Sequence, residues 1–175
     1  MSERQVSYRY GRIEDNKAIS ELGALVFLSS FGSSLPHDDL KTYLSEAYSP
    51  MSIATDLRDP SVTFVVAIRD ETLVGFLQLR RGTSERCIDE RTNKIQLQRL
   101  YVSESCQGLG IGKRLLAEAE REARAMGATS IWLASWKPNI KAERIYESNG
   151  YAKAGEMSFM LGDSKLVDWV MIKSL

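Results

Sequence analysis

A short glycine-rich segment, Gln107 to Lys113, carries the residues whose types and spacing most clearly suggest chemistry. It reads Gln-Gly-Leu-Gly-Ile-Gly-Lys, so three glycines alternate with larger residues just before an amphipathic helical pattern. Glycines at this spacing let backbone N–H groups turn toward one point without a Cβ in the way. The first N–H groups of the following helix are also unpaired, and the helix dipole favours an anion there. The segment therefore predicts a cradle for a phosphate or pyrophosphate.

Several phosphate-binding patterns compete for this segment. A Walker A loop fails because Gln107 stands where its first glycine belongs and Arg114 where its Ser or Thr would bind magnesium. The dinucleotide fingerprint fails at its last glycine spacing, and about a hundred residues precede the segment. A third pattern, Gln/Arg-x-x-Gly-x-Gly/Ala, matches at Gln107, Gly110 and Gly112. Taken alone, the segment is also compatible with a glycine-rich turn that binds nothing.

A second motif lies downstream of the glycine segment. Asn-x-x-Ala-x-x-x-Tyr-x-x-x-Gly-Tyr is present, with its named residues at Asn139, Ala142, Tyr146, Gly150 and Tyr151. With the strand-like Leu100-Tyr101-Val102 before the glycines, the chain resembles the GNAT superfamily of N-acetyltransferases. The resemblance is strong from about residue 62 to 175 and weaker over the N-terminal helices. It implies an enzyme that takes acetyl from acetyl-CoA, with no metal required.

The resemblance also implies roles for particular residues. Tyr146 would act as general acid beside the cofactor sulfur, although alone it reads equally as an aromatic on the apolar face of a helix. Asn139 would hydrogen-bond the pantetheine chain, and it also suits a helix N-cap. Backbone amides near Leu100–Val102 would polarise the thioester carbonyl like an oxyanion site. The residues expected to contact acetyl-CoA are Leu100, Tyr101, Val102, Gln107, Gly108, Leu109, Gly110, Ile111, Gly112, Lys113, Asn139, Ala142 and Tyr146.

The acceptor is less well determined than the donor. The chain is similar to bacterial spermidine/spermine N-acetyltransferases of the PaiA kind in three segments. They are Pro36-x-Asp38-Asp39-Leu40, Trp132-Leu133-x-x-Trp136, and the ending around Phe159–Asp163 with Asp168. That similarity implies a small-molecule amine, a polyamine, as acceptor. Acceptors that are protein or peptide amines, other small amines, or a CoA-binding regulator without turnover remain open.

The general base is not identified by the sequence. Many relatives place a Glu on the strand before the glycine segment, but this strand carries Gln96 and Gln98. An alkylamine has a pKa near that of Lys, so forming its neutral state at pH 7 costs on the order of 4–5 kcal/mol. Ordered water, Glu85 or Glu156 are the candidates for taking the proton.

The elements that would position these residues alternate along the chain. We expect an α/β (α+β) GNAT fold, in which a mixed, mostly antiparallel sheet carries helices on both faces. The resemblance implies a V-shaped splay between the strands around 95–102 and 130–136. A buried stripe of Ile19, Leu22, Leu25 and Val26 is expected on the first helix. The expected strands are 6–10, 62–68, 73–79, 95–102, 130–136, 151–161 and 167–172, the last of which ends the sheet. The expected helices are 15–29, 36–47, 52–58, 110–126 and 139–149.

Composition narrows the class of protein. The 175 residues fit one domain spanning 1–175, and the 23 basic and 23 acidic residues cancel. Net charge gives no reason to expect nucleic acid or a membrane as partner. One histidine and two distant cysteines match no metal spacing. We expect a cytoplasmic protein, because no signal peptide or membrane span is visible. The oligomeric state stays open, a homodimer through the terminal strands included.

Overall fold

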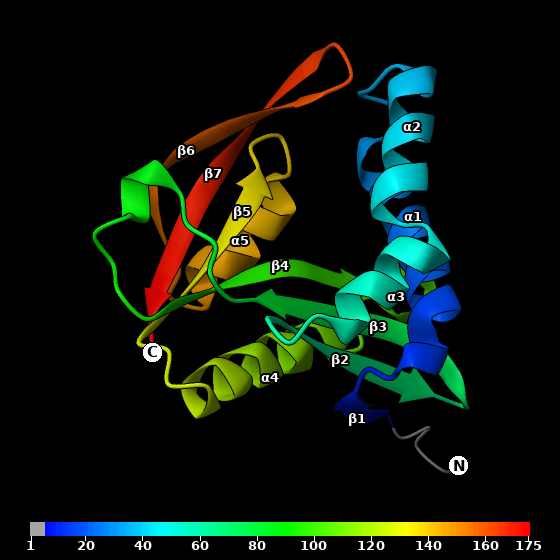
Figure 1. Ribbon diagram of the computed structural model, residues 1–175, viewed down its shortest axis with the longest axis horizontal. Coiled ribbons are helices and arrows are strands. Elements are labelled where there is room, and N and C mark those ends of the chain that lie inside the picture. The colour runs from blue at the N-terminus through cyan, green and yellow to red at the C-terminus, as the bar shows by residue number, and fades with distance from the viewer. Residues whose placement is uncertain (1–5) are drawn as a thin grey trace.

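One mixed sheet runs through the molecule in the computed structural model, which describes residues 6–175 (Figure 1). Its strands are β1 (Ser7–Tyr10), β2 (Val62–Arg69), β3 (Thr72–Arg80), β4 (Lys94–Val102), β5 (Ser130–Trp136), β6 (Ala152–Leu161) and β7 (Ser164–Ser174). The helices are α1 (Asn16–Phe31), α2 (His37–Ala47), α3 (Pro50–Arg58), α4 (Ile111–Ala125) and α5 (Ile140–Ser148).

The strand order is β1-β2-β3-β4-β5-β7-β6, and only the β4–β5 pair is parallel. That pairing is short, since it ends where Gln96 meets Trp132. From there β5 stays paired with β7 as far as Trp136 and Asp168, while β4 continues beside β3 alone. The two strands therefore part beyond Gln96 and Trp132. The expected mixed sheet and its V-shaped splay are both confirmed.

The last strand is longer than expected and lies inside the sheet, between β5 and β6. Val170 and Met171, on opposite faces of β7, are both completely buried. A strand covered on both faces belongs in the interior of a sheet. By contrast β6 is mostly exposed along its length, so it forms the free edge. The strand expected at 167–172 is indeed the last strand along the chain, but the expectation that it ends the sheet is wrong, because β6 forms the edge.

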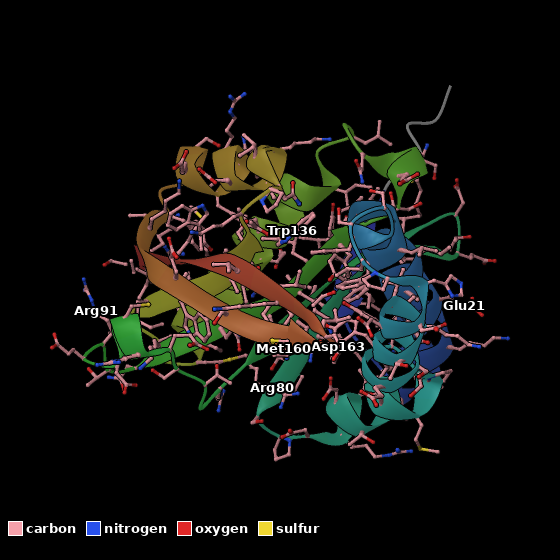
Figure 2. The ribbon with its side chains drawn as sticks, turned by 90° about the horizontal axis from the view of Figure 1, so that it is seen from above. Glu21, Arg80, Arg91, Trp136, Met160 and Asp163 are labelled. Carbon is pink, nitrogen blue, oxygen red and sulfur yellow. The ribbon has the colours of Figure 1, made fainter. Side chains whose placement is uncertain are left out.

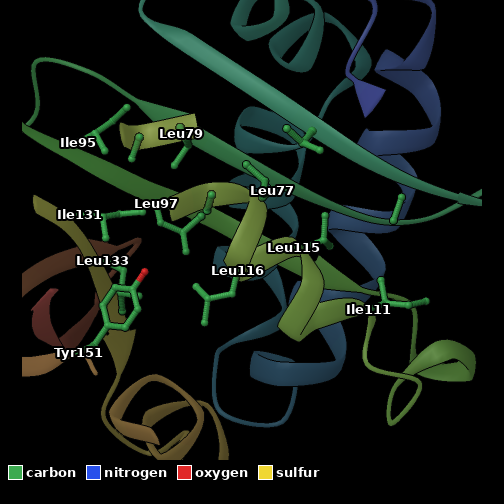
Figure 3. Packing of buried hydrophobic residues seen from close by; sticks show 14 of the residues in the cluster. Leu77, Leu79, Ile95, Leu97, Ile111, Leu115, Leu116, Ile131, Leu133 and Tyr151 are labelled. Atoms are coloured by element: carbon green, nitrogen blue, oxygen red, sulfur yellow. The ribbon is translucent and has the colours of Figure 1, made fainter. Parts of the chain in front are cut away.

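Helices cover both faces because neighbouring strand residues point in opposite directions. On β2, Val65 and Ala67 face α4, where they join the largest core cluster (Figure 3). Phe64 and Val66 face the other way and pack under α1 with Ile19. The core is thus divided by the sheet into an α4 side and an α1 side.

The helix α1 shows one error in the expected buried stripe. Leu25 is 65% exposed, whereas Ile19 and Leu22 are buried as expected. The buried face is centred on Ile19 and extends to Phe27. At 3.6 residues per turn, Leu25 points about 120° away from Ile19, so it faces solvent.

Candidate active site

The glycine segment adopts the backbone shape that its composition suggests. Gly108 and Gly110 both have φ of +79°, in the left-handed region that side chains with a Cβ disfavour. Gly110 is the N-cap of α4, so the second of these turns leads directly into the helix. A Cβ added at Gly108 or Gly110 would meet no atom within 4 Å. The glycines are therefore required by the backbone angle, and the space beside them is free.

The backbone N–H groups of this segment are available to a ligand. The first helical bond runs from Arg114 N to Gly110 O at 3.0 Å. Within residues 6–175, no N–H from Gly108 to Lys113 donates to another backbone group. The exposed Lys113 adds positive charge at the N-terminus of α4, where the dipole already favours an anion. This arrangement can bind a phosphate or pyrophosphate group.

Gly112 differs from the other two glycines of the segment. It lies in the first turn of α4, and a Cβ there would sit 3.7 Å from Val102 Cγ2, an ordinary van der Waals contact. The fold itself would accept an alanine at this position. A glycine is needed at Gly112 only if a ligand approaches the helix closely.

The end of β4, at Leu100, Tyr101 and Val102, can contact a ligand mainly through backbone groups. They lie in β4 beyond the last β5 pair, so the strand edge that faces β5 has no partner strand there. Leu100 and Val102 pack against the core on the α4 side. Tyr101 points to the α1 side, where its hydroxyl lies 2.8 Å from that of Tyr48 and burial raises its pKa to about 12. Gln107 ties the segment to β4 through a 3.4 Å bond from Nε2 to Val102 O.

The second motif forms the start of α5. Asn139 is its N-cap, with Oδ1 accepting a 3.1 Å bond from Ala142 N. The side-chain nitrogen Nδ2 of Asn139 makes no hydrogen bond within the described part of the chain, so the cap leaves a donor free for a ligand. The N-cap interpretation is therefore correct, and it does not compete with the binding role.

Tyr146 lies one turn further along α5 and is half-buried. Burial raises the pKa of its phenol to about 12. Its ring meets that of Tyr151 edge-on at 5.8 Å and packs on the same core cluster as Leu100 and Val102. Its hydroxyl makes no hydrogen bond among residues 6–175, and it is not among the fully buried polar atoms. The structure thus brings an unengaged phenol to the α4 side of the splayed strands.

On the α1 side lies an aromatic cluster that sequence reasoning did not assemble. Phe31 of α1 packs against Trp136 of β5, with ring centroids 4.5 Å apart and ring planes tilted by 38°. Phe27 joins Phe31 at 4.3 Å and Tyr43 of α2 at 4.8 Å. The buried Asp168 of β7 lies on this side and acts electrostatically on Tyr43. No sequence spacing links these residues, because they come from four separate elements.

Of the acids considered for the general base, Glu156 forms an ion pair with Lys137, and Glu85 precedes the short 3-10 turn Arg86–Ile88.

Two surface hollows lie elsewhere, beside Gly150 and beside Tyr8, and neither is lined by a residue predicted for the site. Within residues 6–175 no cluster of metal-ligating side chains occurs, and none of the helices has the length and apolar character to cross a bilayer.

Comparison with known proteins agrees with this geometry. The family model described as "Acetyltransferase (GNAT) family" matches residues 28–151. A spermidine N(1)-acetyltransferase of Thermoplasma acidophilum is 26% identical over 143 residues, covering 79% of this chain and 83% of that protein. An uncharacterized N-acetyltransferase in the pepI 3' region of Lactobacillus delbrueckii subsp. lactis is 26% identical over 149 residues, covering 85% and 86%.

The fold is shared with a crystal structure of the PaiA N-acetyltransferase from Thermoplasma acidophilum in complex with coenzyme A. The TM-score is 0.80 at 23% sequence identity, and the match covers 98% of this chain and 99% of the other. Because the family model spans most of the chain, including the glycine segment and α5, the chain belongs to the GNAT family and is an acetyl-CoA-dependent N-acetyltransferase.

Proposed function

We propose that the protein transfers acetyl from acetyl-CoA to a primary amine, with spermidine or spermine as the leading acceptor. The observation that carries the donor half is the row of unpaired N–H groups from Gly108 to Lys113, placed beside the unpaired edge of β4. Coenzyme A has the two parts that these features would bind, a diphosphate for the helix start and an extended chain with amides for the strand edge.

In this proposal the pyrophosphate lies on the N–H groups from Gly108 to Lys113, and the remaining segment residues, Gln107 included, hold the cradle in place. The pantetheine amides pair with the open edge of β4 at Leu100–Val102, in the manner of an added strand. The free side-chain nitrogen Nδ2 of Asn139 donates to the pantetheine, and the small Ala142 leaves room for the pantetheine.

The reaction is a direct attack of the amine on the thioester carbonyl, which acetyl-CoA supplies. N–H groups of the open β4 edge polarise that carbonyl. Tyr146 gives its phenolic proton to the departing sulfur. Its raised pKa of about 12 keeps the proton on the oxygen throughout the neutral range, as a general acid requires.

A polyamine is favoured as acceptor because two curated relatives carry that activity in their names. One is the Thermoplasma enzyme, and the other is a spermine/spermidine N(1)-acetyltransferase of Bacillus subtilis, 32% identical over 72 residues. The aromatic cluster on the α1 side supports the same class, because aromatic faces attract ammonium groups. A cytoplasmic location belongs to this proposal, and cell fractionation would test it.

An acceptor screen tests the proposal directly. Thiol release from acetyl-CoA would be followed with spermidine, spermine, free amino acids, and peptides bearing a free N-terminus or a lysine. We expect the highest kcat/KM with a polyamine. Turnover of peptides without turnover of spermidine would show that the protein is an acetyltransferase whose acceptor is not a polyamine. Tight binding of acetyl-CoA with no turnover of any amine would favour a CoA-binding regulator.

A further inference from the structure

Asp168 is a buried carboxylate on β7, the strand next to the β6 edge of the sheet. It lies on β7, in register with Trp136 of β5 on one side and Met157 of β6 on the other. Its exposed fraction is 9%, so it is nine-tenths buried. Leucine or valine would be the ordinary occupant of such a position.

Asp168 stands out from the other buried acids because nothing pairs with it. Glu118, Glu120 and Glu122 of α4 each form ion pairs with Arg or Lys side chains. The Oδ1 atom of Asp168 is fully buried without a hydrogen-bond partner, and no cation among residues 6–175 lies within ion-pair distance. An unpaired buried carboxylate lowers stability. The fold gains nothing from Asp168, so a binding role explains its presence better.

The surroundings of Asp168 suit an organic cation. Trp136, its register partner, packs against Phe31 with ring centroids 4.5 Å apart. Tyr43 of α2 lies within electrostatic reach of the carboxylate. Nearby, Asp163 N at the tip of the β6–β7 hairpin donates to Asp39 Oδ2 of α2 at 3.3 Å, and Figure 2 shows that tip beside the helices. Aromatic faces and a carboxylate without a cation are together the features that recognise an alkylammonium group.

The carboxylate also lies on the opposite side of the sheet from Tyr146. On the face of Asp168, Val170 and Trp132 pack under Ile88. On the other face, Leu133 and Met171 belong to the α4 cluster, where Tyr146 packs. Asp168 pairs with the final residue of β5, in the part of that strand that has separated from β4. A thioester held in the splay would therefore have the phenol on one side and the carboxylate on the other.

We propose that Asp168 binds the ammonium group of the acceptor and takes its proton before the attack. This inference rests on the proposed function and names the base that it lacked. One N–H proton passes to the carboxylate, and the freed lone pair forms a C–N bond with the thioester carbon. The C–S bond breaks, and the sulfur leaves with the electron pair of that bond and receives the proton of Tyr146. The nitrogen, positively charged after the attack, then loses its second proton, which returns through solvent to the Tyr146 phenolate, so that a neutral amide and a free thiol remain.

The environment of Asp168 sets a pH range for this role. Burial raises the pKa of the carboxyl from 3.8 to about 6, so the charged form dominates only above that pH. The neighbours that face it on β5, β6 and the 3-10 turn are Trp136, Met157 and Ile88, which do not titrate. Of the titratable groups of α2, Tyr43 interacts electrostatically with Asp168, and burial raises its pKa to about 12, while Asp39 bonds the backbone at the tip of the β6–β7 hairpin. The largely buried Arg99 of β4 is the cation that also acts on Tyr43, and it forms its ion pair with Asp56. Amine binding should therefore strengthen as the pH rises through about 6.

The test compares Asp168→Asn with a matched amide substitution at Asp163, an exposed acid on the same hairpin. At pH 7.5 we expect kcat/KM for spermidine to fall about 100-fold or more in D168N, with acetyl-CoA affinity by calorimetry unchanged. The acidic limb near pH 6 should disappear from the kcat/KM profile of D168N. D163N should match the wild type in all three measurements. Retention of both activity and the acidic limb in D168N would overturn the inference.

Two further arms separate this inference from its alternatives and from the proposed function. Loss of the limb in Glu156→Gln or Glu85→Gln, with D168N normal, would assign the base elsewhere. Calorimetry of spermidine binding to the CoA-saturated protein provides a readout without turnover. Binding by the wild type that D168N loses would support the carboxylate even if no amine were acetylated. No binding by the folded wild type would overturn it.

Discussion

The two sides of the splayed strands present different kinds of groups, backbone on one side and side chains on the other. The donor region, residues 100–113 and 139–146, presents backbone N–H groups on two left-handed glycines, a helix start and an open strand edge. The acceptor region, defined by Phe31, Tyr43, Trp136 and Asp168, presents side chains from four distant elements. Backbone recognition suits a ligand that never changes, whereas side chains can be exchanged to suit different amines. The difference explains why the donor is easier to assign than the acceptor.

The largest effect is expected at Tyr146, the one side chain of the donor region that we propose takes part in the reaction. Tyr146→Phe should lower kcat by about 100- to 10,000-fold, the usual contribution of a general acid, with little change in acetyl-CoA affinity. Steady-state kinetics and calorimetry would measure both. Tyr151→Phe is the matched control, because its ring touches Tyr146 and its buried hydroxyl has no partner in the described chain. Equal kcat in wild type and Y146F would remove Tyr146 from the reaction.

The next effect concerns the stability of the acceptor region. Folding raises the pKa of Asp168 to about 6, so folding favours its protonated form. This contribution is fully present below the unfolded value of 3.8 and is lost as the pH rises through about 6. It amounts to roughly 3 kcal/mol. Urea denaturation from pH 4.5 to 7.5 should show D168N gaining stability relative to the wild type as the pH rises. Parallel curves would mean that the carboxyl is not buried as described.

A smaller effect tests whether the donor region depends on backbone shape. Gly110→Val and Gly82→Val impose the same strain, because both glycines have positive φ and open space around them. Each should cost about 1–3 kcal/mol of stability. Only G110V should also weaken acetyl-CoA binding, by about 10- to 100-fold, or about 1.4–2.8 kcal/mol. Equal affinities in the two variants would contradict the cradle.

The smallest effect uses Gly112, where stability and binding should move in opposite directions. Gly112→Ala adds a Cβ in ordinary contact with Val102, and it should stabilise α4 by up to about 1 kcal/mol. The same Cβ should weaken acetyl-CoA binding severalfold if the ligand approaches the helix. Thermal unfolding with and without acetyl-CoA would measure both effects. A variant that is more stable and binds equally well would place the ligand away from Gly112.

The same contrast explains how much of the molecule could be predicted from its sequence. Gly110 and Asn139 were identifiable because they act through local backbone geometry, which short motifs record. Gly127, which follows α4, has a φ of +80° for the same kind of local reason. Leu25 was misplaced because it lies 120° around the helix from the buried centre, an angle that depends on where the sheet lies. Asp168 could not be identified as a site residue, since its burial depends on β7 entering between β5 and β6.

The most direct measurement is the stoichiometry of transfer. The protein would be incubated with acetyl-CoA and spermidine, and mass spectrometry of the polyamine would be compared with the amount of free thiol. We predict one acetylated amine for each thiol released, with no release above background when the amine is omitted. Thiol release without an acetylated amine, or firm binding of acetyl-CoA with no release for any amine tested, would contradict the account.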